Sequence, residues 1–350
     1  MGPSRKIFYS ACSLLPVGML KRMAPRLLLP YHHLVSDEEV LHVKHLYPYK
    51  NIAQFSADLD TLLRHFRPVA ADEVAAAVRG GKALPRNAFL LTFDDGFRQV
   101  AEIIAPILLA KGVPAVFFVN PAFLDNRLLF YRCKISLVIE ALMQKKGQPQ
   151  LWTACGEILG QAAAGLISRI KKIDNLNQDL LERLAPLLEL SFDEYLRNKR
   201  PFLTSAEAWE LQKKGFTIGA HSWDHPYYDL IPEEEQRRQT LESMEYVREK
   251  FAPSYNLFSF PHTDAGLPQG FFDRLFASGA PIDVFFGIQN QKEERSNRML
   301  HRFNAERPDL PMARQLNGVL MYMLLQKMSG KYKVVRRSGG VINSLTNEYP

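Results

Sequence analysis

The segment Leu90-Leu91-Thr92-Phe93-Asp94-Asp95-Gly96 is an apolar run that ends in two adjacent carboxylates and a glycine. An apolar run that stops at such a turn is typical of a buried strand. In α/β folds the functional groups gather at the carboxyl ends of these strands. Because neighbouring carboxylates repel, placing both here costs stability unless a cation or a partner base offsets the repulsion. The same residues also fit an ordinary acidic turn, since Asp-Gly is a common turn pair.

A second polar cluster follows another short apolar run, at His221-Ser222-Trp223-Asp224-His225-Pro226. Two imidazoles four residues apart can bind one metal ion. Together with an aspartate oxygen they leave a coordination position open for water, as catalytic sites do. The other interpretation is a pair of surface histidines in a turn before Pro226. The presence of both clusters in one chain favours the metal site.

The two clusters resemble the signature motifs of the metal-dependent polysaccharide deacetylases. The family motifs T-F-D-D-G and H-[ST]-x-x-H-P match Thr92 to Gly96 and His221 to Pro226 at every position. Tyr31-His32-His33 is similar to the family's first strand. The resemblance implies an α/β fold, namely an irregular (β/α) barrel of the polysaccharide deacetylase type.

The resemblance also implies a reaction and a set of site residues. The reaction is metal-assisted removal of an N-acetyl or similar N-acyl group from a sugar in a glycan or glycan precursor. Asp94 would be the general base, and a backbone N–H near Phe260-Pro261 would stabilise the oxyanion. One divalent metal ion, with zinc as the first choice, would be bound by Asp95, His221 and His225.

A third family motif, R-x-P-Y, is altered in this chain and reads Ser259-Phe260-Pro261-His262. Ser259 stands where the family has the arginine that orients the catalytic aspartate. We expect Phe260, Pro261 and His262 to contact the substrate. The histidine that acts as general acid in the family has two candidates here, His262 and His301. The exchanged arginine keeps a catalytically impaired carbohydrate-binding relative open as the alternative function.

A third possibility is a phosphotransfer enzyme that uses the aspartate pair with Mg²⁺. It is disfavoured because Mg²⁺ prefers oxygen ligands, which would leave both histidines unused.

The rest of the chain alternates between predicted strands and helices, which is typical of a parallel sheet. Asn51 and Thr204 are predicted to cap helices. The alternation lapses at about 121–200, where the pattern is helical and too long for a connecting loop. We therefore divide the chain into an N-terminal extension (1–26), a deacetylase-like barrel (27–308) with this helical insertion, and a C-terminal helix with a basic tail (309–350).

Composition restricts the partners and the compartment. The 350 residues, 47% of them hydrophobic, suffice for one large barrel domain with additions. The net charge of +7 is compatible with nucleic acid, phosphate-bearing lipids or acidic glycans and selects none of them. No nucleic-acid-binding motif accompanies it, so we expect no nucleic acid, and the resemblance implies a carbohydrate substrate. Three dispersed cysteines and the lack of a cleavage site after residues 7–20 predict a cytoplasmic protein. Basic residues around that apolar stretch allow peripheral contact with the inner face of the membrane.

Overall fold

The computed structural model describes residues 8–9, 12 and 17–337, and its main sheet consists of parallel strands. The spatial order of these strands is β10-β9-β8-β7-β6-β5-β2-β11. In chain order they are β2 (Pro30–His32), β5 (Leu91–Phe93), β6 (Ala115–Val119), β7 (Thr217–Ala220), β8 (Leu257–Ser259), β9 (Val284–Gly287), β10 (Met299–His301) and β11 (Phe303–Asn304). Most of their side chains are buried, as the uninterrupted apolar runs in the sequence predict for a parallel sheet.

The sheet closes on itself through one stretch of chain. β10 pairs with β9, whereas β11 pairs with β2 at the other end of the sheet. Arg302 is the single residue between these two strands. Its N–H donates to the carbonyl of Gly287 at 2.8 Å, and the N–H of Phe303 donates to the carbonyl of Leu29 at 3.0 Å. This closure confirms the predicted irregular (β/α) barrel.

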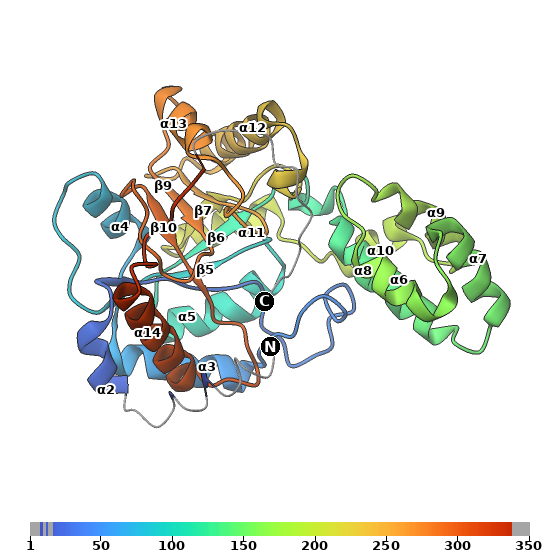
Figure 1. The fold of residues 1–350 in the computed structure, drawn as a ribbon, viewed down its shortest axis with the longest axis horizontal. Coiled ribbons are helices and arrows are strands. Elements are labelled where there is room, and N and C mark those ends of the chain that lie inside the picture. The colour runs from blue at the N-terminus through green and yellow to red at the C-terminus, as the bar shows by residue number, and fades with distance from the viewer. Residues whose placement is uncertain (1–7, 10–11, 13–16, 338–350) are drawn as a thin grey trace.

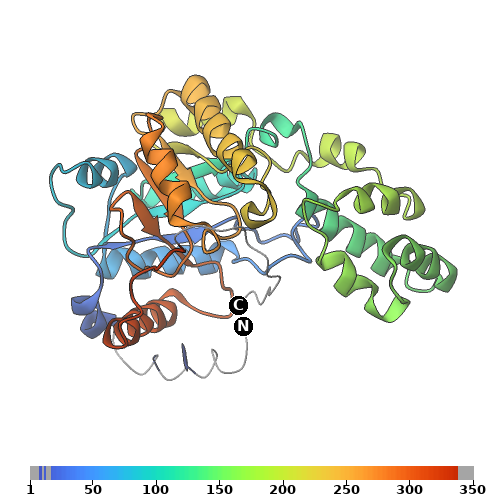
Figure 2. The same cartoon turned by 45° about the horizontal axis from the view of Figure 1, so that its top comes forward.

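Helices cover the outside of the barrel (Figures 1 and 2). They are α3 (Ile52–His65), α4 (Ala71–Val78), α5 (Ala105–Lys111), α11 (Ser205–Lys213), α12 (Glu233–Phe251), α13 (Gln269–Ala277) and α14 (Met312–Met328). Both predicted caps are confirmed: Asn51 accepts from the N–H of Gln54 at 2.8 Å, and Thr204 accepts from the N–H of Glu207 at 3.1 Å. A second, three-stranded sheet extends one side of the barrel, in the order β1 (Leu27–Leu28), β4 (Ala88–Phe89), β3 (Arg67–Pro68).

The segment between β6 and α11 folds into a helical lobe, residues 131–199, that projects from one side of the barrel in both views (Figures 1 and 2). Its helices are α6 (Tyr131–Gln144), α7 (Pro149–Leu159), α8 (Leu166–Lys171), α9 (Asp179–Leu187) and α10 (Phe192–Lys199). The lobe has its own apolar core, which continues onto Phe97 and Phe202 of the barrel side. The shared core anchors the base of the lobe beside the ends of the strands.

The apolar stretch near the N-terminus lies partly outside the described residues. Its described end, α2 (Val17–Leu20), buries Val17 and Leu20 in the barrel's core together with residues of α14. Within the described ranges, no helix has the length and apolar character needed to cross a membrane. Peripheral membrane contact by this stretch stays a prediction.

Candidate active site

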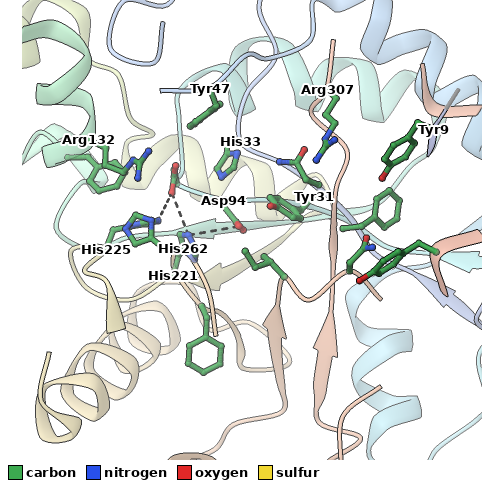
Figure 3. Close-up of a pocket in the computed structure, with 18 of the residues that line it drawn as sticks. Tyr9, Tyr31, His33, Tyr47, Asp94, Arg132, His221, His225, His262 and Arg307 are labelled. Carbon is green, nitrogen blue, oxygen red and sulfur yellow. Dashed lines mark hydrogen bonds and ion pairs between the residues drawn. The ribbon is translucent and has the colours of Figure 1, made fainter. Parts of the chain in front are cut away.

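Three buried side chains converge at the carboxyl ends of β5 and β7, and Figure 3 shows the histidines among them. Asp95 Oδ1 lies 3.2 Å from His225 Nε2 and 3.5 Å from His221 Nε2. The other nitrogen of each ring is engaged. His221 Nδ1 donates to the Ser259 carbonyl at 2.7 Å, and His225 Nδ1 lies 3.2 Å from His262 Nε2. Both Nε2 atoms are therefore left to face Asp95.

This trio fits one divalent cation. Its donor atoms lie within 4.8 Å of one another, and Asp95 Oδ1 is buried without a hydrogen-bond partner. A buried oxygen with no donor is costly, and a cation would remove that cost. One carboxylate oxygen and two imidazole nitrogens suit zinc and neighbouring transition metals. The structure thus brings together the three ligands predicted from the sequence.

Asp94, the predicted base, is held by a buried guanidinium. Arg302 donates from Nη1 to Asp94 Oδ1 at 2.7 Å and from Nη2 to Asp94 Oδ2 at 2.8 Å. Burial alone would raise the pKa of Asp94, but the charge and hydrogen bonds of Arg302, together with the charge of His221, lower it. The carboxylate is therefore both ionised and fixed in orientation. Its Oδ2 lies 3.9 Å from His221 Nε2, beside the proposed metal position.

Arg302 corrects the expectation that this chain lacks the orienting arginine. The guanidinium comes from the seam between β10 and β11 instead of from position 259. Ser259 accepts a hydrogen bond from Arg302 Nη2 at 2.6 Å, and Thr92 accepts one from Nη1 at 3.1 Å. The sequence carried only a weak signal for this role, an arginine between the strand residues Leu300-His301 and Phe303.

His262, predicted to contact substrate or to act as general acid, lies behind His225. Its Nε2 is 3.2 Å from His225 Nδ1 and 3.2 Å from the Tyr131 hydroxyl. Its ring stacks on Tyr227 with centroids 3.6 Å apart. If His225 Nε2 binds the metal, the Nδ1 of His225 carries the proton and donates it in a hydrogen bond to His262 Nε2. His262 therefore orients His225, as outer partners of metal ligands commonly do.

His301, the other candidate acid, lies in a separate buried cluster. Its Nε2 is 3.2 Å from Glu294, and its Nδ1 is 3.8 Å from Asp264. Arg336 pairs with both of these carboxylates at 2.7 Å. The cluster is therefore internally paired and links the segment after α14 to the barrel. His301 does not line the cavity that holds Asp94, so its candidacy as general acid was wrong.

His33 faces the site and was not assigned a role from the sequence. Its Nδ1 lies 2.7 Å from Glu306 Oε2, and Glu306 Oε1 accepts from the N–H groups of His33 and Leu34 at 3.0 and 2.9 Å. Burial alone would lower the pKa of His33, but the charge and hydrogen bond of Glu306 raise it to about 9. The imidazole is therefore protonated at neutral pH. Strand alternation was the available signal, because His33 follows Tyr31 by two residues and both line the pocket.

These groups open into one cavity of about 600 Å³ (Figure 3). Phe260 and His262 line it, whereas Pro261 does not, and contact of these residues with the substrate stays a prediction. The N–H of Phe260 already donates to the Phe286 carbonyl at 2.9 Å, and a proline has no N–H. Neither residue of this dipeptide therefore offers an N–H to an oxyanion, and a donor elsewhere near Phe260-Pro261 stays a prediction. Other residues that line the cavity include Phe8, Tyr9, Tyr31, Tyr47, Phe130, Arg132, Arg307 and Tyr322.

Replacing both histidine ligands should remove the metal. We expect the double variant His221→Ala/His225→Ala to retain less than about a tenth of the bound zinc, because ligand loss weakens a site even more than the 10–100-fold caused by outer partners. Elemental analysis after dialysis measures this, and circular dichroism checks the fold. His301→Asn, in the separate cluster with Asp264 and Glu294, is the control and should keep the metal. Full metal retention in the double variant would contradict the assignment.

The chain is similar to known proteins in sequence and in fold. The sequence model of the polysaccharide deacetylase family matches residues 81–266. Over 61 residues the chain is 44% identical to the poly-beta-1,6-N-acetyl-D-glucosamine N-deacetylase of Escherichia coli strain K12, a stretch that covers 17% of this chain and only 9% of that protein.

Solved structures show the same fold. The deacetylase PplD of Streptococcus pyogenes, in complex with acetate, superposes with a TM-score of 0.54 at 12% identity, covering 84% of this chain and 98% of that chain. IcaB from Ammonifex degensii superposes with a TM-score of 0.52 at 15% identity, covering 84% and 98% respectively.

Proposed function

We propose that this chain, which belongs to the polysaccharide deacetylase family, removes the acetyl group from an N-acetylated sugar by metal-assisted hydrolysis of the amide. One observation carries the proposal: an ionised, doubly held Asp94 stands beside the trio of Asp95, His221 and His225 in a single cavity. The alternative of an impaired carbohydrate-binding relative depended on a missing arginine, and Arg302 removes that reason.

Two residues of the cavity carry out the proton transfers, Asp94 as the base and His33 as the acid. A divalent cation bound by the trio would supply Lewis acidity for water and for the amide carbonyl. Asp94 accepts the proton of the attacking water, since Arg302 occupies one acceptor position on each carboxylate oxygen and leaves the others free. His33 carries a proton at neutral pH. We assign His33 as the general acid that donates this proton to the departing sugar amine.

The direct test is acetate release from acetylated chito-oligosaccharides by the zinc-loaded protein. We expect acetate and free amine to appear in equal amounts, and the metal-stripped protein to lose this activity until zinc is restored. If the loaded, folded protein releases no acetate from any N-acetylated sugar, the proposed function is wrong.

The assignment of His33 predicts a loss of activity at alkaline pH. The pKa of His33 is raised to about 9, so its proton is present below that pH and is lost above it. Glu306, Asp94 and Asp95 are the charged groups that favour the protonated ring, and the Tyr47 ring packs against it at 4.7 Å. We expect kcat for amide hydrolysis to fall as the pH rises through about 9, and His33→Gln to lower it about 10²-fold at neutral pH.

An activated acetate ester provides the control for His33, because its leaving group needs no proton. The His33→Gln variant should hydrolyse an aryl acetate at a rate close to that of the parent. An unchanged alkaline limb in the variant, or an equal loss on amide and ester, would show that His33 is not the proton donor.

A further inference from the structure

The helical lobe places one cationic side chain in the active-site cavity. Arg132 is the second residue of α6, where the lobe begins, and it lines the cavity together with Asp95 and His225. Figure 3 shows Arg132 on the side of the metal-binding histidines and Arg307 on the opposite side, near Tyr9. The lobe thus contributes directly to the space in which the acetamido group would be bound.

Among the described residues, Arg132 has no carboxylate partner, unlike Arg302 and His33. Arg302 is paired with Asp94, and His33 is paired with Glu306. Arg132 donates from Nη1 to the neutral Tyr227 hydroxyl at 2.8 Å, and within the described part of the chain no carboxylate forms an ion pair with it. Its positive charge therefore remains available to a ligand. Holding an unpaired guanidinium in a partly buried position costs stability, which a bound anion would offset.

A second donor in the same cavity also lacks an acceptor. The Tyr47 hydroxyl is buried and has no hydrogen-bond partner, although Tyr47 lines the cavity with Arg132. The start of α6 adds to the positive potential, because its first turn contains no acidic residue and Phe130 provides no side-chain cap. Asp95 is the carboxylate whose charge acts on Arg132, but its oxygen belongs to the metal-ligand trio.

We propose that Arg132 binds a carboxylate or phosphate group carried by the N-acetylated sugar close to its acetamido group, with the Tyr47 hydroxyl as a second donor. This inference rests on the proposed function and specifies its substrate class as an acidic N-acetylated sugar. A guanidinium presents paired N–H groups that match the oxygens of a carboxylate or a phosphate. The lobe therefore selects the substrate by its charge.

Binding to the Asp94→Asn protein tests the proposal without turnover. The probes are N-acetylglucosamine, which is neutral, N-acetylmuramic acid, which carries a carboxylate, and a phosphorylated N-acetylglucosamine, each titrated by calorimetry. We expect at least one charged probe to bind about 10- to 100-fold more tightly than the neutral one, as hydrogen bonds to an ionised group imply. The charged probe that binds more tightly identifies the anionic group.

Variants of Arg132, compared with a control at Arg183, test whether Arg132 binds the anionic group. Arg132→Gln in the same background should lower the ratio of charged to neutral affinity about 10- to 100-fold, and Arg132→Lys should retain part of it. Arg183→Gln, on the exposed face of the lobe, is the matched control and should keep the full ratio. Thermal melts confirm that each variant is folded.

Three results would overturn the proposal. They are equal affinity for charged and neutral probes, an equal loss of both in Arg132→Gln, and loss of the charge preference in Arg307→Gln instead of Arg132→Gln. A charge preference that depends on Arg132 in a protein that releases no acetate would support the subsite while contradicting the proposed deacetylase function.

Discussion

Asp94→Asn should lower the turnover of acetylated chito-oligosaccharides by about 10²–10⁴-fold while the protein still binds its metal. The amide has the shape of the carboxylate and can still contact Arg302, but it cannot accept a proton from water. Neither Asp95 nor the two histidines change, so the ligand trio stays complete. Rates of acetate release and zinc content by elemental analysis measure the two halves of this expectation.

Two controls make the Asp94 result specific. Asp224→Asn changes an aspartate in the second motif that is outside the cavity lining, and it should keep most of the parent's turnover. Thermal melts of Asp94→Asn show whether any loss reflects unfolding. If the folded, zinc-loaded variant works within a few-fold of the parent, Asp94 is structural and another group is the base.

Arg302→Leu should destabilise the protein by about 3–5 kcal/mol, because it leaves the buried carboxylate of Asp94 without its partner. Chemical denaturation measures this loss. Arg302→Lys keeps the positive charge but loses the bidentate contact with Asp94. Compared with Arg302→Leu, we expect this variant to regain more of the stability than of the activity. Since Arg302 positions Asp94 and is not among the cavity-lining residues, kcat should fall while KM changes little.

Moving the arginine to the position expected from the motif is the sharper test. Ser259 Oγ lies 2.6 Å from Arg302 Nη2, so a longer side chain at position 259 starts next to the space that the guanidinium occupies. We expect the exchange Arg302→Ser/Ser259→Arg to regain about 10-fold or more of the activity lost in Arg302→Ser. An exchange variant no better than the single variant would show that Arg302 has a role beyond orienting Asp94.

The sequence alone identified the groups that are concentrated in short motifs. The ends of two apolar strands carry Asp94, Asp95, His221 and His225 within a few residues, and parallel strands bring their carboxyl ends to one side of a barrel. Helix caps such as Asn51 are likewise local, because acceptor and donor lie three residues apart. Such features depend on backbone periodicity and neighbouring side chains, which the order of residues specifies directly.

Tertiary structure decided which distant side chains complete the site. Arg302 contacts Asp94, 208 positions away in the sequence, and Glu306 contacts His33, 273 positions away. The family motif instead places the orienting arginine at position 259, where this chain has a serine. The sequence offered His301 and His262 as candidate general acids. In the structure His301 lies in the cluster with Asp264 and Arg336, and His262 lies behind His225. A guanidinium can meet a carboxylate from any strand whose end lies at the same side of the barrel. The residue that supplies it is therefore set by how the barrel closes, between β10 and β11, and not by local sequence.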